Sequence, residues 1–152
     1  MGEKILILGI GNVLLGDEGI GVHTVRALIN TKLPDNVTVL DGGTGGFHLM
    51  YYLQEYPKII MIDATIDGKQ PGTISIIKPK YSSDFPKSLS AHDIGLKDLI
   101  ESVALIDKLP DITLITVSIV SLPGMSLELT KEVKESIPEV IEKIKMILDD
   151  QK

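Results

Sequence analysis

The chain has 152 residues, of which 43% are hydrophobic and 24% charged, the balance of a folded globular protein. Its 21 acidic and 15 basic residues give a net charge of −6, which excludes charge-driven binding to nucleic acid or to an anionic membrane surface. The absence of cysteine excludes disulfides, thiolate metal sites and cysteine nucleophiles. We therefore expect one domain over residues 1–152, with no nucleic-acid or membrane partner.

Targeting and membrane segments are not expected. The N-terminus leads directly into an apolar run that is typical of a core strand rather than of a signal peptide. The longest charge-free stretch, residues 112–127, contains Thr, Ser, Pro and Gly and is shorter than a membrane-spanning helix. These features favour a protein of the cytoplasm.

Five short runs rich in β-branched residues have the length of strands. They cover residues 4–8, 37–40, 58–62, 73–77 and 112–119. Most are almost continuously apolar, as in strands of a parallel sheet that are covered on both faces. The run at 73–77 follows too closely on the preceding strand for a crossover helix, so we expect it to lie antiparallel at the edge of the sheet.

Between these runs, apolar residues recur with the period of a helix. The four expected stripes are Val22, Val25, Leu28 and Ile29; Leu49, Leu53 and Tyr56; Leu96, Leu99, Ile100 and Val103; and Val140, Ile141, Ile144 and Leu148. A capping box, Ser136 to Glu139, predicts the start of the last helix and leaves residues 130–135 as a separate short turn. The alternation predicts an α/β fold, a three-layer α/β/α sandwich with a mostly parallel sheet of about five strands.

Acidic side chains follow three of the predicted strands. Asp17 and Glu18 come after the first strand, Asp41 ends the second and Asp63 ends the third. Ligands of open parallel sheets bind beyond the carboxyl ends of the strands, so we expect these four carboxylates to converge there. The structural alternatives are that Asp17 and Glu18 offset a helix dipole, and that Asp41 and Asp63 stabilise turns.

A dinucleotide site is disfavoured. Gly9 and Gly11 follow the first strand, but the third glycine of the fingerprint is replaced by Leu14. Asp17 and Glu18 would also repel a pyrophosphate.

The loop after the second strand consists mostly of small residues. Gly42, Gly43, Thr44 and Gly45 leave backbone amides that could pair with an extended substrate peptide, which makes them candidate substrate-binding residues. The alternative is a tight turn whose positive-φ positions require glycine.

Glu18, Asp63 and His92 together offer two carboxylates and an imidazole. This set suits a divalent first-row metal ion with open coordination positions. The motifs of zinc and serine hydrolases are absent from the sequence.

The pattern resembles the maturation endopeptidases of nickel–iron hydrogenases over nearly the whole chain. The motifs that carry the resemblance are Gly9-x-Gly11-Asn12-x-Leu14-x-x-Asp17-Glu18-Gly19-x-Gly21, Asp41-Gly42-Gly43-Thr44, Asp63-Ala64 and Ser90-x-His92-x-x-Gly95. The resemblance implies a phosphorylase/hydrolase-like fold and a single peptidase domain. It also implies that Glu18, Asp63 and His92 bind a divalent metal.

The resemblance further implies a function. Such proteins remove a short C-terminal peptide from the precursor of the hydrogenase large subunit after nickel has been inserted, and the nickel is presented by the substrate. We expect a monomeric endopeptidase of aspartic or metal-dependent type, in which zinc or cadmium could replace nickel. Asp17 and Asp41 are candidate catalytic carboxylates beside Glu18, Asp63 and His92. The alternative is a non-catalytic, metal-dependent chaperone or checkpoint for the same precursor.

Overall fold

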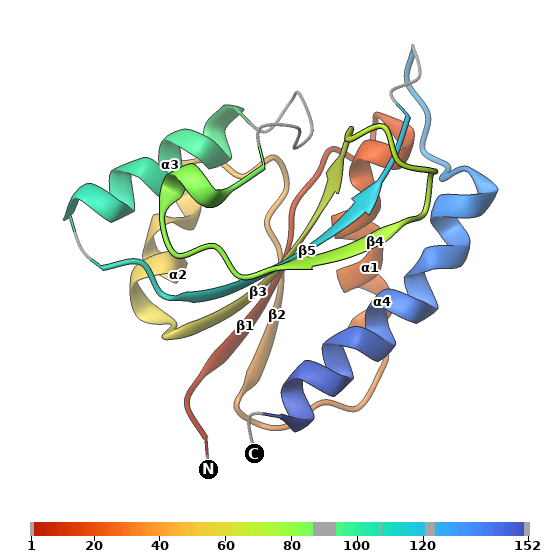
Figure 1. Cartoon of the computed structure of the whole chain (residues 1–152). Coiled ribbons are helices and arrows are strands. Elements are labelled where there is room, and N and C mark those ends of the chain that lie inside the picture. Colours follow the sequence, from red (N-terminus) through yellow and green to blue (C-terminus); the bar gives the residue numbers. More distant parts are fainter. Residues whose placement is uncertain (1, 87–93, 107, 121–123, 151–152) are drawn as a thin grey trace.

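The sheet of the protein has five strands in the order β2-β1-β3-β5-β4 (Figure 1). The computed structural model describes residues 2–86, 94–106, 108–120 and 124–150. The parallel strands are β1 (Ile5–Gly9), β2 (Val37–Asp41), β3 (Lys58–Thr65) and β5 (Asp111–Ser118). Strand β4 (Ile74–Ile77) pairs antiparallel with β5 at the edge, which confirms the expectation for that segment.

Helices cover both faces of the sheet. In Figure 1, α1 (Ile20–Leu28) and α4 (Lys131–Asp149) lie on one side, and α2 (Met50–Glu55) and α3 (Ile94–Ile106) on the other. Three short 3-10 turns complete the elements: η1 (Gly16–Gly19), η2 (Phe47–Leu49) and η3 (Ser82–Asp84). The three-layer α/β/α prediction is therefore confirmed.

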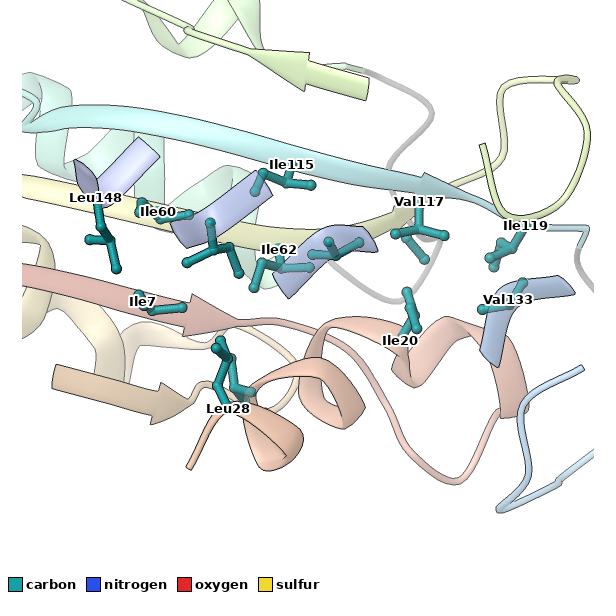
Figure 2. Close-up of a cluster of buried hydrophobic side chains, with 14 of the residues drawn as sticks. Ile7, Ile20, Leu28, Ile60, Ile62, Ile115, Val117, Ile119, Val133 and Leu148 are labelled. Atoms are coloured by element: carbon teal, nitrogen blue, oxygen red, sulfur yellow. The ribbon is translucent and has the colours of Figure 1, made fainter. Parts of the chain in front are cut away.

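Alternation along the strands divides the core into two clusters. On β3, Ile60 and Ile62 pack toward α1 and α4, whereas Ile59 and Met61 pack toward α2 and α3. Figure 2 shows the first cluster, with side chains of α1 and α4 against the sheet. Because both faces of β1, β3 and β5 are buried, these strands carry the nearly continuous apolar runs seen in the sequence.

The expected division of the C-terminal segment at Ser136 is wrong. A single helix, α4, runs from Lys131 with Thr130 at its N-cap and contains Pro138 in its interior. Ser136 is buried, and its hydroxyl donates to the carbonyl of Val133 at 2.5 Å, so its side chain cannot cap a new helix. The stripe formed by Val133 and Val140 is buried on both sides of the proline, and this burial keeps the helix continuous.

Helix α1 begins in very close contact with the ends of β1 and β3. A Cβ added at Gly21 would collide with the carbonyl oxygens of Ile62 and Ile10. A Cβ at Gly9 would likewise collide with the carbonyl of Gly21. Glycine is therefore required here for close packing of helix on sheet, and the packing fixes the chain that crosses between β1 and α1.

No helix among the described residues is long and apolar enough to cross a membrane.

Candidate active site at the carboxyl ends of the strands

A cavity of about 290 Å³ opens at the carboxyl end of β5. Its walls come from residues 15–18 before α1, residues 119–120 after β5, and residues within the segment 124–130 before α4. The acidic side chains among them are Asp17, Glu18 and Glu128. The cavity lies where ligands of parallel sheets bind, and its charge favours cations.

The first and last of these segments are joined by backbone hydrogen bonds. Ser126 N–H donates to the carbonyl of Leu14 at 2.9 Å, and Gly16 N–H donates to the carbonyl of Ser126 at 2.7 Å. Leu15 and Ser126 form an isolated parallel bridge. The segment before α4 is therefore fixed against the segment before α1.

Asp17 extends this connection through its side chain. One carboxylate oxygen accepts the N–H of Thr130 and the other accepts its hydroxyl, both at 2.7 Å. Asp17 is only 7% exposed. Both of its carboxylate oxygens are thus engaged by a residue 113 positions away in the chain.

Glu18 is the second buried acid of the same turn. It is 6% exposed and lines the cavity. Its backbone is held tightly, because a Cβ at Gly11 would meet the carbonyl of Glu18 and a Cβ at Gly19 would lie 2.8 Å from Val13 Cα. The turn η1 therefore offers a carboxylate at the cavity in a backbone that has little room to move.

Asp63 lies near the end of β3 and is fully buried. One of its carboxylate oxygens accepts the N–H of Ala64 at 2.7 Å. It follows Ile59 and Met61 in the alternation, which places it on the α2–α3 face. Turn η1 contacts β3, so Glu18 and Asp63 belong to the same edge of the sheet, although Asp63 is not part of the cavity wall.

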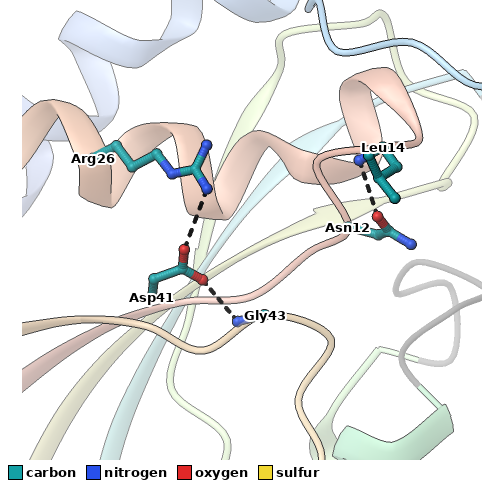
Figure 3. A network of polar contacts seen from close by, with 5 residues as sticks. All are labelled: Asn12, Leu14, Arg26, Asp41 and Gly43. Carbon is teal, nitrogen blue, oxygen red and sulfur yellow. Dashed lines mark hydrogen bonds and ion pairs between the residues drawn. The ribbon is translucent and has the colours of Figure 1, made fainter.

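Asp41 differs from the other acids in its surroundings and lies between Arg26 and Gly43 (Figure 3). It follows Val37 and Val39 in the alternation of β2 and so faces the α1–α4 side. Its carboxylate lies 3.6 Å from the guanidinium of Arg26 and accepts the N–H of Gly43 at 2.9 Å. Its side chain is 41% exposed.

The glycine loop after β2 uses several of its amides within the chain. Gly42 N–H donates to the carbonyl of Gly9 at 2.8 Å, and Gly45 N–H donates to Gly42 at 3.2 Å. Gly43, whose amide is bound to Asp41, has a φ of +54°, which explains why glycine is needed there. These three amides are already paired, so the loop has fewer donors for a substrate strand than the sequence suggested.

The family model described as hydrogenase maturation protease matches residues 22–147. The chain belongs to the hydrogenase maturation protease family. It is 37% identical to the hydrogenase expression/formation protein HupD of Rhizobium leguminosarum bv. viciae over 91% of this chain and 71% of that protein. It is 38% identical to the hydrogenase 2 maturation protease of Escherichia coli over 70% of this chain and 67% of that protein.

Solved structures of this family share the fold. The hydrogenase maturating endopeptidase HybD of Escherichia coli superposes with a TM-score of 0.86 at 34% identity, covering 97% of this chain and 93% of that one. Against two further HupD relatives, the chain spans only 58% and 53% of their length.

The third residue of the expected metal-binding set, His92, lies outside the described residues. Among the residues that the structure describes, no three His, Asp or Glu side chains are grouped closely enough to hold a metal ion. The structure thus places Glu18 and Asp63 at one edge in this member of the hydrogenase maturation protease family, and the complete set stays a prediction.

Sequence reasoning missed the segment that closes the cavity. Ser126, Glu128 and Thr130 line the cavity, and Ser126 and Thr130 are bonded to the segment before α1, which lies more than a hundred residues away in the sequence. Thr130 is a suitable N-cap residue for the last helix and could have indicated this segment. The capping box at Ser136 instead predicted a later start for that helix.

One histidine near the site has a perturbed pKa. Burial lowers the pKa of His23, the charge of Arg26 lowers it further, and Asp17 opposes both effects. Its Nε2 atom is buried and has no hydrogen-bond partner among the described residues. The imidazole is therefore expected to be neutral at pH 7.

Proposed function

We propose that this chain is an endopeptidase that removes a short C-terminal peptide from the nickel-loaded precursor of a nickel–iron hydrogenase large subunit. The main support is that two buried acids, Glu18 and Asp63, lie at the carboxyl edge of the sheet in a member of the hydrogenase maturation protease family. A buried carboxylate is costly unless hydrogen bonds or a cation compensate it, so such acids are typical of functional sites.

In this proposal nickel belongs to the substrate. Glu18 and Asp63 supply oxygen donors and His92 supplies a nitrogen donor, a set that suits a divalent first-row metal. Zinc or cadmium could occupy the same donors. Binding of the loaded precursor through its metal would hold the scissile peptide at the edge of the sheet, and fixed geometry of this kind accelerates attack by water.

Asp41 is the better candidate for the carboxylate that activates water. Asp17 has both oxygens engaged by Thr130, whereas Asp41 is partly exposed and its ion pair with Arg26 is long. Asp41 ends β2 and Asp63 lies two residues before the end of β3, on strands either side of β1, so their backbones are about 10 Å apart for two strand spacings. Their side chains leave opposite faces of the sheet, so a peptide would have to cross the ends of the strands to contact both groups.

The chemical role follows from that position. A carboxylate at Asp41 would take a proton from the attacking water and return it to the amine that leaves when the peptide bond breaks. The glycine loop beside it would contact the tail of the precursor, with Thr44 as its exposed side chain.

A non-catalytic checkpoint is the second candidate function. It is favoured by the engagement of Asp17 with Thr130 and of Asp41 with Arg26 and Gly43, which leaves neither acid without partners. In this case the precursor would bind to the same cavity and stay uncut.

The test is to incubate the purified chain with nickel-loaded and metal-free precursor and to follow loss of the C-terminal peptide by mass spectrometry. We expect cleavage of the loaded precursor alone. Glu18→Gln should lower the rate about 100-fold or more, since an essential group is removed. Glu139→Gln, on the exposed side of α4, is the matched control and should cleave normally. Binding of loaded precursor without cleavage would identify the checkpoint instead.

A further inference from the structure

We propose that Asp17 is a positioning residue whose hydrogen bonds to Thr130 hold residues 126–130 against Glu18 and so build the second wall of the cavity. The inference rests on the proposed function, because it assigns the cavity to the precursor and assigns Asp17 a role other than water activation.

The geometry of the Asp17 carboxylate is that of a group that holds its partner in place. Its two oxygens accept two different donors of one residue, the amide and the hydroxyl of Thr130, each at 2.7 Å. Asp17 is 7% exposed and both bonds are partly buried, so competing water has limited access to them. A carboxylate used in this way fixes the position of its partner.

The hydroxyl of Thr130 makes an unusual hydrogen bond for a threonine at a helix N-terminus. It is the N-cap of α4, where a threonine ordinarily accepts a hydrogen bond from an amide of the first turn. No such bond is formed, and the hydroxyl donates to Asp17 instead. The negative charge of Asp17 therefore lies at the N-terminus of α4, where the helix dipole favours an anion.

The contacts follow the same order along the two segments. Leu14 and Gly16 are bonded to Ser126, and Asp17, the next residue, is bonded to Thr130, which is four residues after Ser126. Glu18 follows directly and lines the same cavity as Ser126 and Thr130. Leu129 also packs against the core, but without the bonds of Asp17 the described hydrogen bonds between the two segments would be limited to Ser126, and the wall would be free to open beside Glu18.

The role differs from general-base catalysis in how it responds to asparagine. In Asp17→Asn, the amide oxygen can accept a hydrogen bond from the Thr130 N–H. The amide nitrogen can donate to the Thr130 hydroxyl, because a hydroxyl oxygen accepts hydrogen bonds as well as donating them. The wall would stay in place although the charge and the basic group are lost. Asp17→Ala removes the connection altogether.

The experiment compares Asp17→Asn, Asp17→Ala, Thr130→Val and Thr130→Ser by steady-state cleavage of the nickel-loaded precursor. We expect Asp17→Asn to keep kcat within about threefold of wild type, because the hydrogen-bonding shape is preserved. Asp17→Ala should raise KM about 10-fold with a smaller change in kcat, as for other residues that orient a binding group. Thr130→Val should move KM in the same direction, and Thr130→Ser should restore it.

Hydrogen–deuterium exchange provides a measurement that does not depend on cleavage. The amides of Gly16, Ser126 and Thr130 should exchange faster in Asp17→Ala and in Thr130→Val than in wild type or Thr130→Ser. If Asp17→Ala fails to fold, the valine and serine variants of Thr130 carry the comparison.

Two results would overturn the inference. The first is a loss of kcat of about 100-fold or more in Asp17→Asn, which indicates a general base. The second is unchanged exchange of the 126–130 amides in both Asp17→Ala and Thr130→Val. If wild type itself leaves loaded precursor uncut, the proposed function fails, and the exchange result alone decides whether Asp17 holds the wall.

Discussion

Two junctions at the carboxyl edge of the sheet place an acid among glycines, one between β1 and α1 and the other between β2 and α2. In the first, Asp17 is buried and bonded to Thr130, far along the chain. In the second, Asp41 is partly exposed and bonded to Gly43, its near neighbour. The glycines differ as well, since Gly21 is pressed against backbone whereas a Cβ at Gly43 would meet nothing within 4 Å.

Similar local sequences, each with an acid among glycines, therefore have different structural roles at the two junctions. The first junction is a packed structural unit, and its acid can stabilise the fold without touching a substrate. The second is a surface turn with fewer structural demands, so its acid is better placed to meet a ligand. Variants of the two junctions should therefore separate stability from activity.

The largest expected effect is on stability in Gly21→Ala. The added methyl group collides with the carbonyls of Ile62 and Ile10, so the helix must move off the sheet at a cost of about 3 kcal/mol. Gly43→Ala is the matched control and should cost about 1 kcal/mol, for its positive φ alone. Urea denaturation of both variants measures the difference, and equal losses would contradict the contrast between the junctions.

Asp41→Asn should affect activity rather than stability. If Asp41 activates water as proposed, loss of its carboxylate should lower kcat about 100-fold. The side chain is partly exposed and asparagine can still accept the Gly43 N–H, so the thermal midpoint should stay near that of wild type. Full activity in a stable Asp41→Asn variant would remove this residue from the catalytic groups.

Asp17→Ala should lower the free energy of unfolding more than Asp41→Ala does. It leaves the Thr130 N–H and hydroxyl without their acceptor, which should lower the free energy of unfolding by about 2 kcal/mol. Asp41→Ala loses an exposed ion pair and should cost less than about 1 kcal/mol. Chemical denaturation at neutral pH compares the two, and a larger loss in Asp41→Ala would reverse the assignment.

The smallest effect concerns His23 in α1. Because burial lowers its pKa in the folded state, the unfolded chain binds the proton first as the pH falls below 6.5. Stability should therefore decline from pH 7 toward the lowered folded-state pKa, and His23→Gln should decline less over the same range. Thermal midpoints measured in one buffer series at constant ionic strength give the comparison, and parallel curves would contradict it.

The sequence by itself determined the layers of the fold and the edge of the sheet where the buried acids lie. Burial on both faces requires continuous apolar runs, so β1, β3 and β5 were visible without any tertiary information. The short connection before β4 fixed its antiparallel direction, and Asp63 was identified from its place after the apolar run at 58–62, although β3 itself continues to Thr65. These features depend on the local period of hydrophobic residues and on chain length, which a single sequence contains.

Only the tertiary structure decided what the acids at that edge contact. The bonds of Asp17 to Thr130 join segments 113 residues apart, and the continuity of α4 through Pro138 depends on burial of Val133 and Val140 against the sheet. A local sequence pattern cannot predict such contacts. The capping box at Ser136 has the same sequence whether that serine is exposed to water or buried in the core. The faces taken by Asp41 and Asp63 likewise depended on strand register, since a shift of one residue exchanges the two sides of a sheet.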